Sequence, residues 1–174
     1  MTAPPVILET VRLILRPHSL DDFASVAALW SEPLVTRFTS GSQPSTPEES
    51  WQRLLRYHGL WPALGFGYFA LADKKAGHFL GEAGLADFHR DVTPSLEGFA
   101  EAGWALMPAA WGKGFALEAM TAILEWYAST SDARPVACMV NPENAASLRL
   151  AEKLGFRLKA QALYKGAEGL MFER

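Results

Sequence analysis

A glycine-containing turn between a strand pattern and a long helix pattern constrains the fold of this chain most. The turn is Trp111-Gly112-Lys113-Gly114-Phe115-Ala116, and it follows an apolar segment that predicts a strand over 99–107. Apolar residues then recur at helical spacing for about four turns, namely Ala116, Ala119, Met120, Ile123, Leu124 and Tyr127. Unpaired backbone N–H groups and the positive end of the helix dipole meet at such a join. The turn therefore suits an anion, and a phosphate above all.

The two glycines of the turn have a predicted physical task. A side chain at Gly112 or Gly114 would hold a pyrophosphate away from the backbone and would restrict the φ angles that the turn can adopt. A Walker P-loop does not fit, because Lys113 lies between glycines and no Ser or Thr follows it to hold magnesium. A Rossmann site does not fit either, because the turn follows an antiparallel meander and lacks the third glycine. The remaining alternative is a tight turn without a ligand.

The rest of the chain predicts strands and helices that alternate around one sheet. Strands are predicted over 11–16, 66–72, 78–88, 99–107, 135–140, 156–163 and 169–172. Helices are predicted from Ser19 to the residue before Pro33, from Thr46 to a stop at Gly59 and Pro62, and over 142–154 with Gly155 as the stop. The expected fold class is therefore α/β (α+β), with a mixed, mostly antiparallel central sheet of about seven strands flanked by about four helices.

Composition and charge exclude several classes of protein. Hydrophobic residues make up 49% and charged residues 20% of the 174 residues, which favours one folded domain over 1–174 rather than a disordered or membrane protein. The net charge is −3 and the basic residues are scattered, so nucleic acid is not an expected partner. No apolar run approaches the roughly 20 residues of a membrane helix. The segment Met1–Pro5 lacks a basic stretch followed by an apolar one, so a cytoplasmic location is expected.

Metal and cysteine chemistry are not expected. Cys138 is the only cysteine, so no disulfide can form within the chain. It lies in an apolar strand pattern, where a lone cysteine is usually a small buried hydrophobe rather than a nucleophile. The histidines show no spacing typical of a metal site, and they are His18, His58, His78 and His89.

Four short sequence blocks stand out in the second half of the chain. In order they are Gly103-Trp104-Ala105-Leu106, Trp111 to Ala119, Asn144-Ala145-Ala146-Ser147 and Glu152-Lys153-Leu154-Gly155-Phe156. Together they resemble the GNAT superfamily of N-acetyltransferases, most of all the branch of ribosomal-protein alanine N-acetyltransferases. One block alone is a weak signal, but four in this order are specific, and the resemblance spans nearly the whole chain from Leu8–Leu13 onward.

The resemblance implies that the chain binds acetyl-CoA. The pantetheine arm is then expected to pair with the backbone at 104–107 and with Asn144, and the pyrophosphate is expected to meet the turn at 112–116. The general family pattern has Gln or Arg where Trp111 stands, so one polar contact is missing and backbone amides are left to bind. The cofactor-binding residues that it predicts are Trp104, Ala105, Leu106, Met107, Trp111, Gly112, Lys113, Gly114, Phe115, Ala116, Asn144 and Ser147.

The same resemblance implies transfer of the acetyl group to a primary amine by direct attack in a ternary complex. Glu101 is the candidate base, acting through water; the alternative is a solvated or salt-bridged Glu at a strand end. Many family members protonate the leaving thiolate from a tyrosine seven residues after the asparagine, where this chain has Ala151. Ser147 matches a serine given this role in the ribosomal alanine branch; alternatively it only caps or solvates its helix. A backbone amide near Met107 would polarise the thioester carbonyl.

The sequence leaves the acceptor open. A peptide or protein N-terminal α-amine follows from the branch, whereas an aminoglycoside, polyamine or amino acid acceptor, or a non-catalytic acyl-CoA-binding regulator, would keep the fold. The loops over 40–49 and 88–97 would decide the acceptor. Several aromatic residues could line its pocket, although aromatics at such spacing are more often core; they are Trp30, Trp51, Trp61, Phe66 and Tyr68. A homodimer is expected by analogy with the branch.

Overall fold

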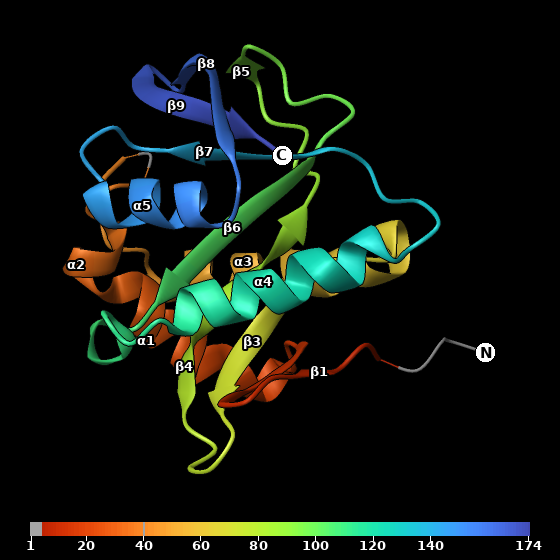
Figure 1. Ribbon diagram of the computed structural model, residues 1–174. Coiled ribbons are helices and arrows are strands. Elements are labelled where there is room, and N and C mark those ends of the chain that lie inside the picture. Colours follow the sequence, from red (N-terminus) through yellow and green to blue (C-terminus); the bar gives the residue numbers. More distant parts are fainter. Residues whose placement is uncertain (1–4, 40) are drawn as a thin grey trace.

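Nine strands form one open sheet in the described part of the chain (Figure 1). The computed structural model describes residues 5–39 and 41–174, so the targeting prediction for Met1–Pro5 and the acceptor-loop prediction for Ser40 lie partly outside it. The strands are β1 (Leu8–Glu9), β2 (Leu13–Pro17), β3 (Tyr68–Asp73), β4 (Phe79–Ala86), β5 (Val92–Thr93), β6 (Ala100–Leu106), β7 (Val136–Val140), β8 (Arg157–Tyr164) and β9 (Ala167–Glu173). Their order in the sheet is β1-β2-β3-β4-β6-β7-β9-β8-β5, and only β6 and β7 pair in parallel.

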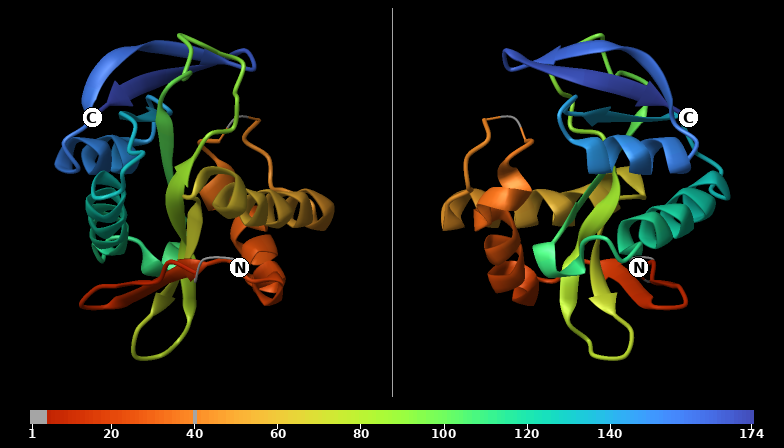
Figure 2. Two further views of the ribbon diagram at one scale, coloured as in Figure 1. Left: turned by 90° about the vertical axis from the view of Figure 1, so that its right-hand side faces the viewer. Right: turned by 60° about the vertical axis from the view of Figure 1, so that its left-hand side comes forward.

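Helices cover both faces of this sheet (Figure 2). They are α1 (Phe23–Ser31), α2 (Pro33–Thr36), α3 (Pro47–Leu64), α4 (Phe115–Ala128) and α5 (Ala145–Lys153). The helices α4 and α5 lie on one face, and α1 to α3 lie on the other. The largest core cluster joins α4 to the sheet and includes Phe69, Leu71, Leu85, Met120 and Ile123. A second cluster, under α1 and α3, comprises Val26, Leu29, Trp30 and Leu54. The predicted fold class is confirmed.

One predicted helix boundary is right and one is wrong. The first helix, α1, ends at Ser31, before Pro33 as predicted, and Pro33 begins the separate helix α2, because proline lacks an N–H that the first helical position would leave unused. Gly59 and Pro62 lie inside α3, which continues to Leu64 and stops at Gly65, whose φ is 77°. Local propensity disfavours both residues in a helix interior. Burial of the apolar side of α3 outweighs this preference, as tertiary packing commonly does.

The strand β6 changes partners along its length. It pairs antiparallel with β4 along the whole stretch from Glu101 to Leu106. With β7 it pairs only at its start, where Ala100 is opposite Val136 and Glu101 is opposite Ala137. From Ala102 onward the two strands diverge, and α5 lies in front of the opening (Figure 1). One edge of β6 is therefore left open to a ligand.

A partly buried ion pair ties the end of β2 to the start of α1. The Nη1 and Nη2 atoms of Arg16 donate to Oδ2 and Oδ1 of Asp22, each at 2.7 Å, and the backbone N–H of Ser19 also donates to Oδ2 at 2.7 Å. Burial alone would raise the pKa of Asp22, but these hydrogen bonds outweigh it and the pKa is lowered. Asp22 therefore stabilises the fold above its unfolded pKa of about 3.9, and this contribution is lost as the pH falls through the lower folded value.

We expect Asp22→Asn to reduce the free energy of unfolding at pH 7 by about 1–2 kcal/mol, a modest loss because Arg16 is partly exposed to solvent. Urea denaturation at pH 7, 5 and 3 measures this difference. The gap between variant and wild type should close as the pH falls toward 2, because the wild-type carboxyl is then protonated. A gap of equal size at every pH would contradict this account.

Candidate cofactor and catalytic site

The turn before α4 presents a row of unpaired backbone donors. Gly112 and Gly114 have φ angles of 70° and 78°, in the left-handed region that favours glycine. The backbone N–H groups of residues 112–117 donate no hydrogen bond to any group in the described chain, and the first bond of the helix runs from Glu118 N to Gly114 O at 3.0 Å. A Cβ at Gly112 would meet nothing within 4 Å, so the space before the turn is open. The turn fits a pyrophosphate.

Arg12 brings a second cation to this turn beside Lys113. Its Nη1 donates to the Lys113 carbonyl at 2.8 Å, and its guanidinium lies 4.5 Å from the centroid of the Phe115 ring. Glu118, in the first turn of α4, accepts from Nε of Arg12 at 2.6 Å and holds the arginine there. Sequence reasoning missed Arg12, because it lies 101 positions from Lys113 in the chain and no local pattern links them.

Only every second residue of β6 directs its backbone N–H and C=O groups toward the open edge. The Met107 N–H donates to Leu80 O at 2.9 Å, and with the β4 register this directs the backbone groups of Ala105 and Met107 toward β4. The backbone groups of Trp104 and Leu106 point the other way, into the opening toward β7. The Met107 N–H is therefore already paired, and of the amides near it the Leu106 N–H is the one that faces the opening. The N–H groups of Trp104 and Leu106 are the ones that a pantetheine arm can reach, whereas the Leu106 carbonyl accepts from the Trp111 indole at 2.8 Å.

The N-terminus of α5 closes the far side of this opening. The Asn144 side chain caps the helix, with Oδ1 accepting from the Ser147 N–H at 3.1 Å. Ser147 Oγ accepts from the indole Nε1 of Trp104 at 3.1 Å, so its own hydroxyl proton remains available to a ligand. Ala151, at the position of the family tyrosine, is 0% exposed in the core. Ser147, the predicted acid, lies beside the open edge of β6 through its contact with Trp104.

Glu101 is tied to an arginine. Glu101 is 8% exposed, and its Oε1 and Oε2 atoms accept from Nε of Arg90 at 2.8 and 2.7 Å. Burial lowers the pKa of Arg90, but the Glu101 carboxylate together with the Tyr164 hydroxyl and Tyr68 outweighs this, and the pKa is raised. The Arg90 guanidinium also lies over the Phe88 and Tyr164 rings, at 4.7 and 5.2 Å from their centroids. A cavity of about 490 Å³ opens beside Glu101 and Arg90. The salt-bridged Glu that the sequence allowed is thus present, next to an accessible cavity.

The two candidate catalytic residues lie on opposite faces of β6. Trp104 faces α5, where its indole meets Ser147. Ala105 and Met107 pack with the α1 and α3 cluster, and side chains alternate along a strand, so Glu101 faces the α1 and α3 side. The structure therefore places Ser147 beside the open stretch of β6 and Glu101 just before that stretch, on the opposite face, with no contact between the two described side chains.

Most of the predicted pocket aromatics are core residues. Trp30, Phe66 and Tyr68 are buried, and Trp61 packs edge-on against the Phe69 ring at 4.9 Å between centroids. Trp51 is 38% exposed. The general expectation that such aromatics are core thus holds for most of them.

The described residues offer this site neither a cluster of metal-ligating side chains nor an accessible cysteine. Cys138 is buried, and burial raises the pKa of its thiol to about 12, which suits a small core residue. Within residues 5–39 and 41–174, no three His, Cys, Asp or Glu side chains gather so that they could hold a metal ion. None of the helices in the same ranges has the length and apolar character needed to cross a bilayer.

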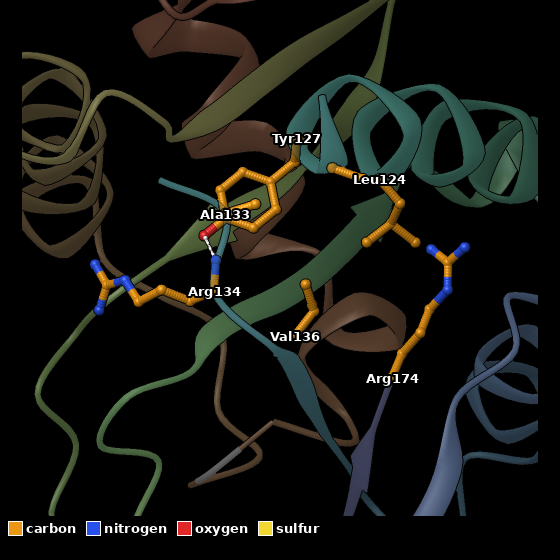
Figure 3. Close-up of a pocket in the computed structure, with 7 residues that line it drawn as sticks. Leu124, Tyr127, Ala133, Arg134, Val136 and Arg174 are labelled. Carbon is orange, nitrogen blue, oxygen red and sulfur yellow. Dashed lines mark hydrogen bonds between the residues drawn. The ribbon is translucent and has the colours of Figure 1, made fainter. Parts of the chain in front are cut away.

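A second cavity, of about 340 Å³, lies at the other end of α4 (Figure 3). There the backbone N–H of Arg134 donates to the Tyr127 hydroxyl at 3.0 Å, and Arg174 lies across the opening. None of the predicted site residues lines this cavity. It has no part in the site at the glycine turn, which precedes the first residue of the same helix.

Comparison with known proteins agrees with this geometry. The profile of the acetyltransferase (GNAT) domain matches residues 12–157. The chain belongs to the GNAT acetyltransferase family. Its relatives include YkkB of Bacillus subtilis, 31% identical with 85% of this chain and 83% of that protein covered, and the N-acetyltransferase p20 of Bacillus licheniformis, 25% identical with 95% and 91% covered. The predictions of a GNAT enzyme and of acetyl-CoA as its cofactor are confirmed through the family.

Solved GNAT structures superpose closely on this one. A GNAT-family acetyltransferase from Bordetella pertussis is 35% identical, with a TM-score of 0.85 and 97% and 99% of the two chains covered. The ribosomal L7/L12 α-N-protein acetyltransferase RimL, in complex with coenzyme A, is 16% identical with a TM-score of 0.79 and 97% of each chain covered. A ribosomal-protein-S5-alanine acetyltransferase from Vibrio fischeri is 20% identical, with a TM-score of 0.75 and 97% and 96% covered. The last two share the fold of this GNAT protein.

Proposed function

We propose that this GNAT protein moves an acetyl group from acetyl-CoA to the α-amine of a peptide or protein N-terminus, by direct attack in a ternary complex. The observation that carries the proposal is the divided strand β6. One of its edges is open beside a turn of unpaired N–H groups, while Glu101 stands on its other face beside a cavity. Donor and acceptor can therefore meet at one strand from different sides.

The donor site uses backbone groups for most of its contacts. The N–H groups at 112–117, with Arg12 and Lys113, would hold the pyrophosphate. The amides of Trp104 and Leu106 would pair with the pantetheine arm along the open edge, beside the Asn144 side chain at the tip of α5. When bound, acetyl-CoA supplies an acyl group activated as a thioester.

The acceptor amine must be neutral before it can attack. At pH 7, deprotonating a lysine-like amine costs about 4–5 kcal/mol, whereas an α-amine with a pKa near 8 costs only about 1–1.5 kcal/mol. Glu101 would take up the amine proton through a water, with Arg90 fixing the carboxylate in place. A carboxylate already engaged by an arginine suits the less demanding α-amine, and this supports an N-terminal acceptor.

Ser147 would donate its hydroxyl proton to the departing sulfur from the α5 side of β6, where its Oγ contacts the Trp104 indole. We expect Ser147→Ala to reduce kcat by about tenfold, the lower part of the effect of general acid catalysis, because water can replace the hydroxyl. Ser147→Thr keeps a hydroxyl and is the matched control. Steady-state kinetics with both variants measure the effect, and equal kcat values for Ala and wild type would exclude this role.

The test of the function is release of free coenzyme A thiol from acetyl-CoA with four acceptor classes: peptides with free N-termini, amino acids, polyamines and aminoglycosides. The same peptides with an acetylated N-terminus but a free lysine separate α-amines from side-chain amines. Turnover confined to free N-termini supports the proposal. Turnover on a small amine alone would show that the acceptor is that small amine rather than a peptide N-terminus, while the proposed acetyl transfer would stand.

A non-catalytic acyl-CoA-binding regulator is the second candidate. The observations that favour it are the buried Ala151 in place of a tyrosine and the close pairing of Glu101 with Arg90. Tight binding of acetyl-CoA without turnover on any of the four classes would establish it. A homodimer, one domain over the whole chain, a cytoplasmic location and the absence of a nucleic-acid partner stay predictions.

A further inference from the structure

The side chain of Tyr68 lies across three strands on the α1 and α3 face of the sheet. In the register, Tyr68 on β3 is opposite Gly84 on β4, and Gly84 is opposite Gly103 on β6. Side chains of residues opposite each other point to the same face of the sheet. Because Gly84 and Gly103 have no side chain, the sheet surface next to Tyr68 is bare backbone, called here the glycine floor. A methyl group on Gly103 would collide with the Tyr68 hydroxyl oxygen. The hydroxyl therefore reaches the backbone of β6 itself.

A buried cluster holds the Tyr68 ring in this position. The ring stacks on Tyr57 of α3, with 4.6 Å between centroids and 4° between planes. The Tyr57 hydroxyl donates to Oε1 of Glu82, which also accepts from Nε1 of Trp30 at 3.0 Å. Glu82 is 0% exposed. The phenol is thus fixed between a stacked ring and the glycine floor, and its hydroxyl cannot turn far from Gly103.

The Tyr68 hydroxyl has no hydrogen-bond partner in the described chain. Its oxygen is nevertheless not fully shielded from solvent. Burial, followed by the negative charge of Glu101, raises the pKa of Tyr68, so the phenol stays protonated at neutral pH. It can accept one hydrogen bond and donate another, and it will not act as a base.

The position of this hydroxyl matches the place where donor and acceptor would meet. Gly103 lies between Glu101, where β7 leaves β6, and Trp104, whose backbone faces the open edge. An arm that runs along this edge from the glycine turn ends near Gly103, because β7 closes the opening beyond it. The hydroxyl points to this end point from the face that carries Glu101.

We propose that Tyr68 is a further catalytic residue, whose hydroxyl binds the acceptor amine at Gly103 and holds its nitrogen toward the acyl group. This inference rests on the proposed function. The phenol oxygen accepts a hydrogen bond from one amine N–H, while another N–H faces the water that leads to Glu101. The phenol keeps its own proton throughout, and the amine proton passes to Glu101.

Binding of a bisubstrate probe tests the inference without turnover. The probe joins the coenzyme A sulfur through a CH₂CO bridge to the nitrogen of a simple alkylamine or of a peptide N-terminus. We expect Tyr68→Phe to weaken binding of both probes by about tenfold, the worth of one hydrogen bond, and to leave binding of coenzyme A unchanged. Phe keeps the stacked ring, so calorimetric titration reports the hydroxyl alone. Tyr127→Phe, at the distant end of α4, is the matched control.

Kinetics supply the second readout. In Tyr68→Phe, kcat/KM for the amine should fall by about tenfold to a hundredfold, while KM for acetyl-CoA and the unfolding midpoint stay the same. If wild type binds the probes more tightly than coenzyme A and Tyr68→Phe binds them equally well, the inference is overturned and the proposed function stands. If wild type binds neither probe more tightly than coenzyme A, amine transfer and the role of Tyr68 fall together.

Discussion

Glu101→Gln is expected to reduce turnover of a peptide amine by about 10²–10⁴-fold near pH 7, the usual contribution of a positioned general base. Gln keeps the size of the side chain and can still accept from Nε of Arg90, but it cannot take a proton. The deficit should shrink as the pH rises above about 8, the ordinary pKa of an α-amine, because the amine then arrives neutral. Measuring kcat/KM from pH 6 to 9 for both proteins gives this ratio directly.

A matched control separates lost basicity from lost charge. Glu125→Gln removes the same charge from an exposed position on α4, away from the site, and should leave kinetics unchanged. The structural alternative is that Glu101 serves only to neutralise Arg90. In that case kcat/KM of the variant would be lower than that of wild type by the same factor at every pH. The urea concentration at the midpoint of unfolding would be lower as well. A constant deficit of this kind would remove Glu101 from the list of catalytic groups.

Glu82→Leu is expected to lower the free energy of unfolding by about 3–5 kcal/mol, because it leaves buried donors without an acceptor. Trp30 Nε1 and the Tyr57 hydroxyl both donate to Oε1, and Nε2 of His18 lies 3.4 Å from Oε2. All of these groups are buried, so water cannot replace the carboxylate. Urea denaturation at pH 7, followed by tryptophan fluorescence and by circular dichroism, measures the loss.

Glu82→Gln is the informative companion of this variant. It retains one carbonyl oxygen for Trp30 and Tyr57, and we expect it to lose less than half as much stability as the Leu variant. The Leu variant should also lose the activity that depends on Tyr68, since Tyr57 would no longer be fixed beneath it. A change of under about 1 kcal/mol for Leu would show that the cluster tolerates an apolar replacement, as some buried ionic groups do.

The parts of the fold that sequence predicts well are those decided by neighbouring residues. The turn at 111–116 and α4 follow from glycine placement and helical spacing within one short stretch. The helix α3 does not, because Gly59 and Pro62 disfavour a helix locally while contacts with the sheet keep it intact. The two-residue strands β1 and β5 exist only through pairing with β2 and β8, which no local pattern contains.

The candidate site divides in the same way. The unpaired donors at Gly112 to Ala116 were predicted, because they belong to one turn. Arg12 was missed, since it reaches the turn through the docking of a distant hairpin. Which amide near Met107 faces the opening could not be predicted, because the direction of a backbone group depends on the register with β4, which a one-residue change reverses. The free hydroxyl of Tyr68 depends on glycines in two other strands.

The alternation along β6 limits how this enzyme can diversify. Even-numbered residues direct their backbone groups to the open edge, where the proposed donor site lies, and odd-numbered side chains face α1 and α3, where the proposed acceptor site lies. Inserting or deleting one residue within the strand would exchange both sets at once and destroy two sites together. Sequence drift that retunes the acceptor is therefore confined to what surrounds the strand, chiefly the connection from β4 to β6 and the helices α1 to α3. In the proposed reaction, β6 would therefore fix the positions of both substrates relative to each other.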